Sequence, residues 1–142
     1  MTHLTRRFVG SLSRREPPPE DVAWVEAQLL APELELWWQM PVADRRHSIE
    51  VARRFASMGE WARDEMAGAL LHDIGKLQSR LGTCGRVAAT LVGPRTKRFR
   101  LYFDHESIGA DMLTAAGSAP ATTYLLLGIG RAAPSLRAAD DV

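Results

Sequence analysis

Apolar residues recur three or four positions apart along most of this chain, which is the spacing of one face of an α-helix. The first run of this kind holds Val22, Val25 and Leu29, and Pro32 ends or kinks it. No convincing run alternates with the period of two that is typical of a strand. The same spacing, together with Gly and Pro breaks, predicts further helices over residues 33–40, 44–58, 61–73, 86–91, 104–117 and 120–127.

The pattern therefore predicts an all-α fold, a compact bundle of about six helices. Asp44 is expected to cap the helix that runs to Met58, and Gly59 is expected to stop it. Trp37 and Trp38 are adjacent, and adjacent residues cannot share one helix face. We therefore expect one of these tryptophans in the core and the other partly exposed.

The composition is that of an ordinary globular protein. The length of 142 residues suits one domain, with 46% hydrophobic and 25% charged residues. Residues 1–20 contain three consecutive prolines and are expected to form a flexible leader, followed by a single domain over 21–142. The 18 Lys and Arg residues are nearly balanced by 17 Asp and Glu residues. The resulting net charge of +1 does not point to a nucleic acid as partner.

Cysteine usage and the length of apolar runs bear on the compartment. Cys84 is the single cysteine, which excludes an internal disulfide and a zinc site built from several thiolates. No apolar run approaches the roughly 20 residues of a membrane helix, so we expect no membrane contact. These features predict a cytoplasmic protein and leave the oligomeric state open.

Three of the four histidines lie at positions that face the predicted core. His47 shares a helix face with Val51, Phe55 and Met58, and His105 lies inward in the first turn of its predicted helix. One inward histidine is usually a satisfied core residue. Several on different helices are harder to explain by packing alone.

The third inward histidine, His72, follows a run of apolar residues and precedes Asp73. Burying an acid next to a histidine at the end of such a run is unfavourable unless something pairs with both. A metal ion explains the histidines and the acid together, because neutral imidazole and carboxylate bind Zn, Fe, Mn, Co or Ni. The residues thus indicate a metal site to which several helices contribute.

Four segments, in the same order, carry a resemblance to a known family. Residues 70–76, LLHDIGK, resemble the signature of the HD-domain superfamily of metal-dependent phosphohydrolases. Residues 45–52 resemble the helix that supplies the family's first histidine, and residues 136–141 resemble its last ligand helix. Residues 104–113 resemble a segment of members with extra histidines. The chain is identified as a small, truncated or divergent member of this superfamily.

The resemblance implies an HD-like helical bundle and a ligand set that falls on His47, His72, Asp73 and Asp140. These residues would hold one divalent transition metal per chain, which could be Mn, Fe, Co, Ni or Zn. The implied reaction is the hydrolysis of a nucleotide or another small phosphate ester by water that the metal activates.

The same resemblance suggests roles for residues around the ligands. Asp73, Lys76 and His105 are the implied catalytic residues. Lys76, His105 and Arg46 are candidate contacts to the substrate phosphate, for which a helix start beside His105 is favourable. The basic stretch 95–100 is a further candidate, although it is more simply a solvated face.

The chain departs from the family pattern at one place. Members with two metals carry a His-His pair where this chain has Ile129 and Gly130. We therefore expect one metal and a small phosphorylated substrate. The alternative is a non-catalytic HD-like domain that binds a nucleotide or a partner through a degenerate site. A third hypothesis is a di-iron oxygenase, a chemistry that some relatives with extra histidines perform. The absence of a sixth ligand argues against it.

Overall fold

The structure is a computed structural model that describes residues 15–79 and 105–142, and every regular element in these two ranges is a helix. Seven helices have seven residues or more, and α6 is a single turn. The all-α prediction is confirmed for this part of the chain, with slightly more helices than expected. The elements are α2 (Pro19–Gln28), α3 (Ala31–Gln39), α4 (Val42–Ala56), α5 (Arg63–Leu70), α6 (Lys76–Ser79), α9 (His105–Ala115), α10 (Pro120–Leu126) and α11 (Ala133–Asp140).

Several sequence predictions fall outside the described residues. They concern the helix over 86–91, Cys84, the basic stretch 95–100 and residues 1–14 of the leader. Pro19 and Glu20, which the sequence predicts as the end of the leader, are the first two residues of α2. Proline is favourable at a helix start because the N–H that it lacks would have no partner there.

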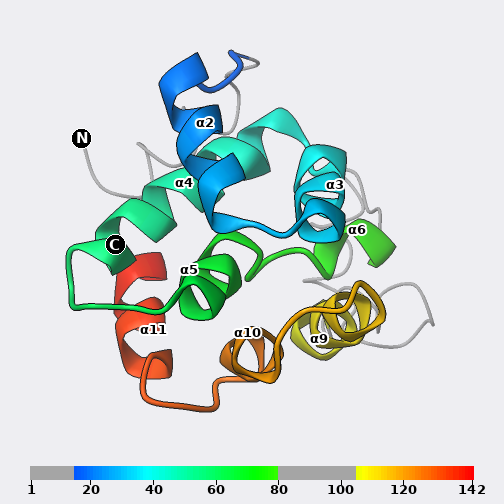
Figure 1. Cartoon of the computed structure of the whole chain (residues 1–142), viewed down its shortest axis with the longest axis vertical. Helices are drawn as coiled ribbons and strands as arrows, with labels where there is room; N and C mark the ends of the chain where they lie inside the picture. The colour runs from blue at the N-terminus through cyan, green and yellow to red at the C-terminus, as the bar shows by residue number, and fades with distance from the viewer. Residues whose placement is uncertain (1–14, 80–104) are drawn as a thin grey trace, which may run out of the picture.

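Helix α5 lies at the centre of the arrangement and packs against α2, α4 and α10 (Figure 1). Small residues along α5 allow this close packing. A Cβ on Gly68 would fall 2.8 Å from Leu125 Cδ2 on α10. Glycine at position 68 therefore lets α5 and α10 approach one another closely.

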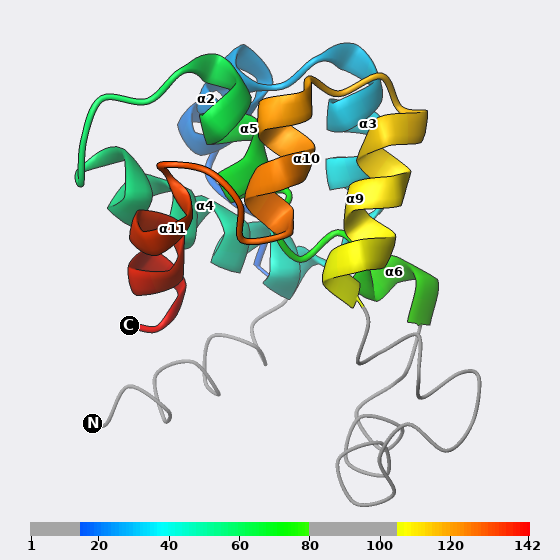
Figure 2. The ribbon, with the colours of Figure 1, turned by 90° about the horizontal axis from the view of Figure 1, so that it is seen from below.

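Two further helix contacts complete the described part. Figure 2 shows α9 beside α10, and α9 also packs against α6. Helix α11 packs against α4, which joins the end of the chain to its first half. Within the described ranges, no helix combines the length and the apolar character that a membrane crossing needs.

The two adjacent tryptophans behave as predicted. Trp37 is fully buried and Trp38 is 44% exposed. The Trp37 Nε1–H donates to Ser48 Oγ at 2.9 Å, so the buried indole nitrogen has a partner on α4. The guanidinium of Arg45 lies 5.8 and 5.2 Å from the two indole centroids. These contacts tie α3 to the first turns of α4.

The predicted ends of the helix that carries His47 are wrong. Helix α4 begins at Val42, directly after the extended Pro41, so Asp44 lies in the first turn and is not the cap. An acid there still interacts favourably with the partial positive charge of the helix start. Helix α4 ends at Ala56, and Met58 lies beyond it with 43% exposure, outside the buried stripe.

The helix predicted over 61–73 is shorter than expected. Helix α5 ends at Leu70, and residues 71–75 form turns. The His72 Nδ1–H donates to the Ala69 carbonyl at 2.8 Å. Since carbonyls in the last turn of a helix lack intrahelical partners, this side-chain bond stabilises the helix end. His72 and Asp73 therefore lie in a turn, not on a helix.

Candidate metal centre

Three of the predicted ligands lie together at the contact between α4 and the turn after α5. His47 comes from α4, and His72 and Asp73 come from the turn. One potential ligand atom of each residue lies within 4.8 Å of those of the other two. The centroids of the two imidazole rings are 5.9 Å apart. Separations of this size suit two or three donors around one metal ion with bonds near 2 Å.

The fourth predicted ligand, Asp140, reaches the same place from α11. Its Oδ1 lies 3.1 Å from His47 Nε2, and these two residues are 93 positions apart in the sequence. The same oxygen lies 3.4 Å from His72 Nε2. The packing of α11 against α4 makes this contact possible. The structure therefore brings all four predicted ligands together, with Asp140 at both imidazoles.

The hydrogen bonding of His72 gives its two ring nitrogens different roles. A backbone carbonyl can only accept, so the bond to Ala69 places the ring hydrogen on Nδ1 and leaves the lone pair of the neutral ring on Nε2. Nε2 is buried and has no hydrogen-bond partner among the described residues. It lies 3.4 Å from Oδ2 of Asp73 and from Oδ1 of Asp140. Three lone-pair-bearing atoms thus converge where a cation would satisfy them, and this donor set fits a transition metal.

The charges of these groups depend on one another. Burial by itself lowers the pKa of His72, but the nearby carboxylates of Asp140 and Asp73 outweigh it, and the net pKa lies above the ordinary 6.5. Contacts with His47 and His72 hold the carboxyl pKa of Asp140 well below 3.8, against the effect of burial. Burial raises the carboxyl pKa of Asp73, yet His72 and Lys76 outweigh it and leave this pKa below 3.8. Both acids are therefore carboxylates, and they favour positive charge between them.

Two cationic side chains predicted near the phosphate have different surroundings. The Lys76 Nζ lies 3.0 Å from Asp73 Oδ2, so its ammonium sits directly at the cluster. Arg46 precedes His47 on α4, and its Nη1 is buried without a hydrogen-bond partner among the described residues. Buried donors are normally paired, so this guanidinium nitrogen is an exception among the described residues.

The predicted role of His105 cannot be placed in the same way. His105 is the first residue of α9, but its side chain lies outside the described part of the structure. Of its expected neighbours on the inner face, Ile108 and Met112 are half-buried. Its assignment therefore remains a prediction from the sequence.

Sequence reasoning missed one residue that contacts the ligand-bearing helix. The Arg54 Nε–H donates to the carbonyl of Ala139 at 2.8 Å, one residue before Asp140. Arg54 lies seven positions after His47, a spacing that places both on one face of α4. That spacing is the signal that could have found it.

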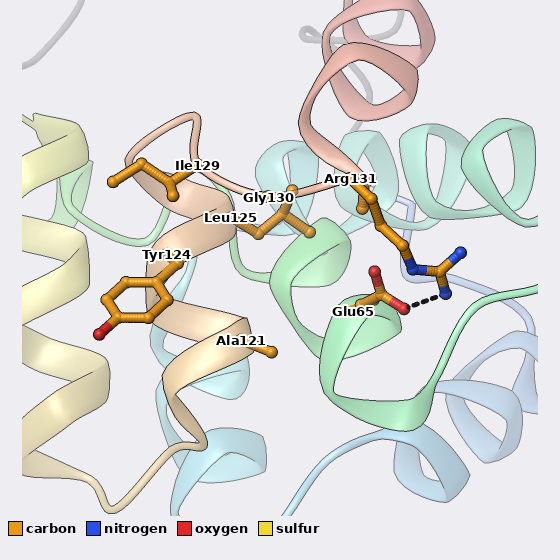
Figure 3. Close-up of a pocket in the computed structure, with 8 residues that line it drawn as sticks. Glu65, Ala121, Tyr124, Leu125, Ile129, Gly130 and Arg131 are labelled. Carbon is orange, nitrogen blue, oxygen red and sulfur yellow. Dashed lines mark hydrogen bonds and ion pairs between the residues drawn. The ribbon is translucent and has the colours of Figure 1, made fainter.

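A pocket of about 210 Å³ lies elsewhere, between α5, α10 and the loop that follows α10 (Figure 3). None of the four predicted metal ligands lines it. Arg131 Nη2 lies 2.7 Å from Glu65 Oε1 at its edge, and this ion pair holds the loop that leads into α11. Ile129 and Gly130 belong to this lining, and Ile129 is 55% exposed.

Comparisons with protein-family models, with curated proteins and with solved structures find no match to this chain.

Proposed function

We propose that this protein is a metal-dependent phosphohydrolase whose described helices form an HD-like domain. The observation that carries the proposal is the convergence of His47, His72 and Asp73 within 4.8 Å, with Asp140 in contact with both imidazoles. The buried Nε2 of His72, which has no hydrogen-bond partner in the described part, is the specific sign that a cation completes the group.

The proposed metal is one divalent Mn, Fe, Co, Ni or Zn ion per chain. Two imidazole nitrogens and two carboxylate oxygens form a donor set that these ions accept. Such an ion lowers the pKa of a bound water and polarises a phosphoryl oxygen. Among the described side chains, the set around His47 is the single group of this kind, which supports one ion in preference to two.

The chain's own cations would receive the phosphate. Lys76 lies 3.0 Å from Asp73 and would bring positive charge beside a phosphate at the cluster. Arg46, which directly precedes His47 on α4, is the second cation proposed to contact the phosphate. A guanidinium is well suited to a phosphate, because it offers several donors in a fixed plane. These two groups favour a small phosphate ester, such as a nucleotide, as substrate.

A non-catalytic binding domain is the second candidate. Ile129 and Gly130 stand in an exposed loop at the positions where two-metal relatives carry histidines. A centre with fewer ligands could keep a metal and a nucleotide without turning the nucleotide over. This candidate shares the metal site with the first and differs from it in activity alone.

Metal analysis together with a substrate screen tests the proposal. The chelated full chain is reloaded separately with Mn²⁺, Fe²⁺, Co²⁺, Ni²⁺ or Zn²⁺, and bound metal, melting temperature and phosphate release from a panel of nucleotides and simple phosphate esters are measured. We expect a metal-to-protein ratio near one, a higher melting temperature with metal and phosphate release that a chelator abolishes. A matched Asp111→Asn variant changes an exposed acid on α9 and should behave as the wild type.

The possible outcomes separate the candidates. Bound metal without hydrolysis of any ester would favour the binding domain. Oxygen consumption by the iron-loaded protein would favour the di-iron oxygenase. If metal-free and metal-loaded proteins melt together and retain no ion, the assigned centre is wrong.

A further inference from the structure

The position of Asp140 on its helix raises the question of what holds it. Asp140 is the last residue of α11, yet its carboxylate contacts His47 on α4 and His72 in the turn after α5. The last carbonyls of a helix have no intrahelical partners, and helix ends open more readily than helix centres. The placement of this ligand therefore depends on how firmly the last turn of α11 is held.

Arg54 donates a hydrogen bond directly to that turn. Its Nε–H donates to the Ala139 carbonyl at 2.8 Å, and Ala139 itself is fully buried. This carbonyl belongs to the last turn of α11, where a cationic donor also interacts favourably with the helix dipole. Because Arg54 and His47 lie on one face of α4, the bond fixes the end of α11 relative to the helix that carries His47.

We propose that Arg54 is a positioning residue of the metal centre. Its hydrogen bond to Ala139 holds the last turn of α11 against α4 and thereby keeps Asp140 at the imidazoles of His47 and His72. The inference rests on the proposed function, because it takes Asp140 to be a metal ligand. Groups that orient metal ligands in this way commonly change metal affinity by about 10- to 100-fold.

The neighbouring Arg53 offers a matched control. Its Nη2 pairs with Asp21 at 3.0 Å, and its guanidinium carbon lies 3.9 Å from the centroid of the Trp24 ring, so it serves the contact with α2. An arginine is thus removed from the same helix in both variants, but only one of the two arginines contacts α11. We expect Arg53→Met to leave metal affinity unchanged.

Two substitutions of Arg54 separate the hydrogen bond from the size of the side chain. Glutamine carries an amide N–H at the same number of bonds from Cα as the arginine Nε, whereas methionine carries a methyl group there. Co²⁺ is titrated into the chelated full chain, and affinity and the visible d–d absorption are recorded. We expect Arg54→Met to weaken Co²⁺ binding about 10-fold or more and to alter the absorption, and Arg54→Gln to stay close to the wild type.

A double-mutant cycle tests whether Arg54 acts through Asp140. In an Asp140→Asn background, Arg54→Met should cause little further loss of Co²⁺ affinity, since the ligand that it positions is already impaired. An equal loss in both backgrounds would overturn the inference, as would wild-type affinity in Arg54→Met. If Arg54→Met melts below the assay temperature, Arg54→Leu replaces it, because leucine also lacks a donor. The inference then requires Arg54→Gln to bind Co²⁺ more tightly than Arg54→Leu, and equal affinities or the opposite order overturn it.

The wild-type titration distinguishes this inference from the proposed function. If the wild-type chain binds no Co²⁺, both fail together. If the wild type binds Co²⁺ and Arg54→Met binds it equally well, the metal centre stands and the role of Arg54 alone is refuted.

Discussion

At the scale of single residues, His72 shows how one side chain serves the fold and the site together. Its Nδ1–H donates to the carbonyl of Ala69 and so stabilises the end of α5. The same bond turns the lone pair of Nε2 toward Asp73 and Asp140. A backbone carbonyl that orients a histidine in this way is a common feature of metal sites. One hydrogen bond therefore stabilises the end of α5 and orients His72 in the cluster.

We predict that Asp73→Ala abolishes metal-dependent phosphate release and leaves the domain folded. The substitution removes the carboxylate that lies 3.4 Å from His72 Nε2 and 3.0 Å from Lys76 Nζ, so a cation loses a charged ligand. Phosphate release, bound metal and thermal melting are measured, with Asp111→Ala on the exposed face of α9 as the control.

Full activity of Asp73→Ala would refute this ligand assignment. If the alanine variant does not fold, Asp73→Asn keeps the shape of the side chain without its charge. The same loss of bound metal is expected of it.

A second residue-scale prediction concerns His105 and comes from the sequence. If His105 lies near the substrate phosphate, His105→Ala should reduce turnover of phosphate esters and keep the metal-to-protein ratio near one. Steady-state kinetics and elemental analysis of both proteins check this. A ratio near two in the wild type that falls toward one in His105→Ala would instead indicate a two-metal centre.

At the scale of elements, the site depends on how closely α5 can lie to its neighbours. The turn that carries His72 and Asp73 follows α5 directly, and α5 packs against both α4 and α10. Gly68 permits the close contact with α10. A Cβ on Gly109 of α9 would lie 3.1 Å from the Gly75 nitrogen, so glycine at position 109 permits α9 to pack against the turn. Small residues thus let α10 lie close to α5 and α9 lie close to the turn that follows it.

We predict that Gly68→Ala destabilises the protein, although alanine is the better helix former. The new Cβ would lie 2.8 Å from Leu125 Cδ2 and 3.1 Å from Leu125 Cβ, so rotation of the leucine alone does not relieve the contact and α10 has to give by a few tenths of an ångström. Overpacking of this kind lowers the free energy of unfolding by about 1–3 kcal/mol, whereas relief of the helix-propensity penalty would raise it by about 1 kcal/mol. Urea or thermal unfolding measures the difference.

The partner side chain provides a control for this prediction. Leu125→Ala removes the atoms that the new methyl group would meet, so the double variant should be more stable than the sum of the two single effects implies. Strict additivity, or a stabilised Gly68→Ala, would show that α5 and α10 are less closely packed than the structure indicates.

At the scale of the whole molecule, the cluster concentrates charge where three parts of the chain meet. His47 comes from α4, His72 and Asp73 from the turn after α5, and Asp140 from α11. Protons and metal ions compete for the same lone pairs. If the cluster holds a metal as proposed, the stability of the entire domain is linked to both pH and metal concentration.

We predict that the cluster stabilises the metal-free protein most between about pH 4 and pH 6.5. The folded pKa of His72 is raised above 6.5, so its stabilisation is present below that pH and is lost as the pH rises through the folded pKa. The folded pKa values of Asp73 and Asp140 lie below 3.8, so their stabilisation is present above that pH and is lost as the pH falls. Unfolding of the chelated protein across this range measures the effect.

Added metal should show the opposite trend at the upper end of the range. Because the metal needs the unprotonated imidazole, the metal-induced rise in melting temperature should be larger at pH 7.5 than at pH 5.5. Asp140→Asn should flatten both dependences. A metal effect that does not change with pH would contradict the assignment of His72 as a ligand.

The sequence by itself determined the helical nature of the described chain and the residues that carry the candidate chemistry. Helical periodicity depends on neighbours three or four positions away, so Val51 and Phe55 revealed the inner face of α4 and with it His47. The same logic required that Trp37 and Trp38 be separated between core and surface. It could not say which is buried, because that choice depends on Ser48 from another helix.

The family resemblance proposed that His47, His72, Asp73 and Asp140 form one group, but only the tertiary structure shows through which contacts they meet. Helix α5 ends at Leu70, and the His72 ring donates a hydrogen bond to the Ala69 carbonyl in its last turn, an interaction that apolar spacing does not reveal. Asp140 reaches His47 across 93 positions, and Arg54 reaches Ala139 across 85, through the packing of α11 on α4. Such contacts arise from the burial of two complementary helix faces, and no property of either segment alone specifies its partner.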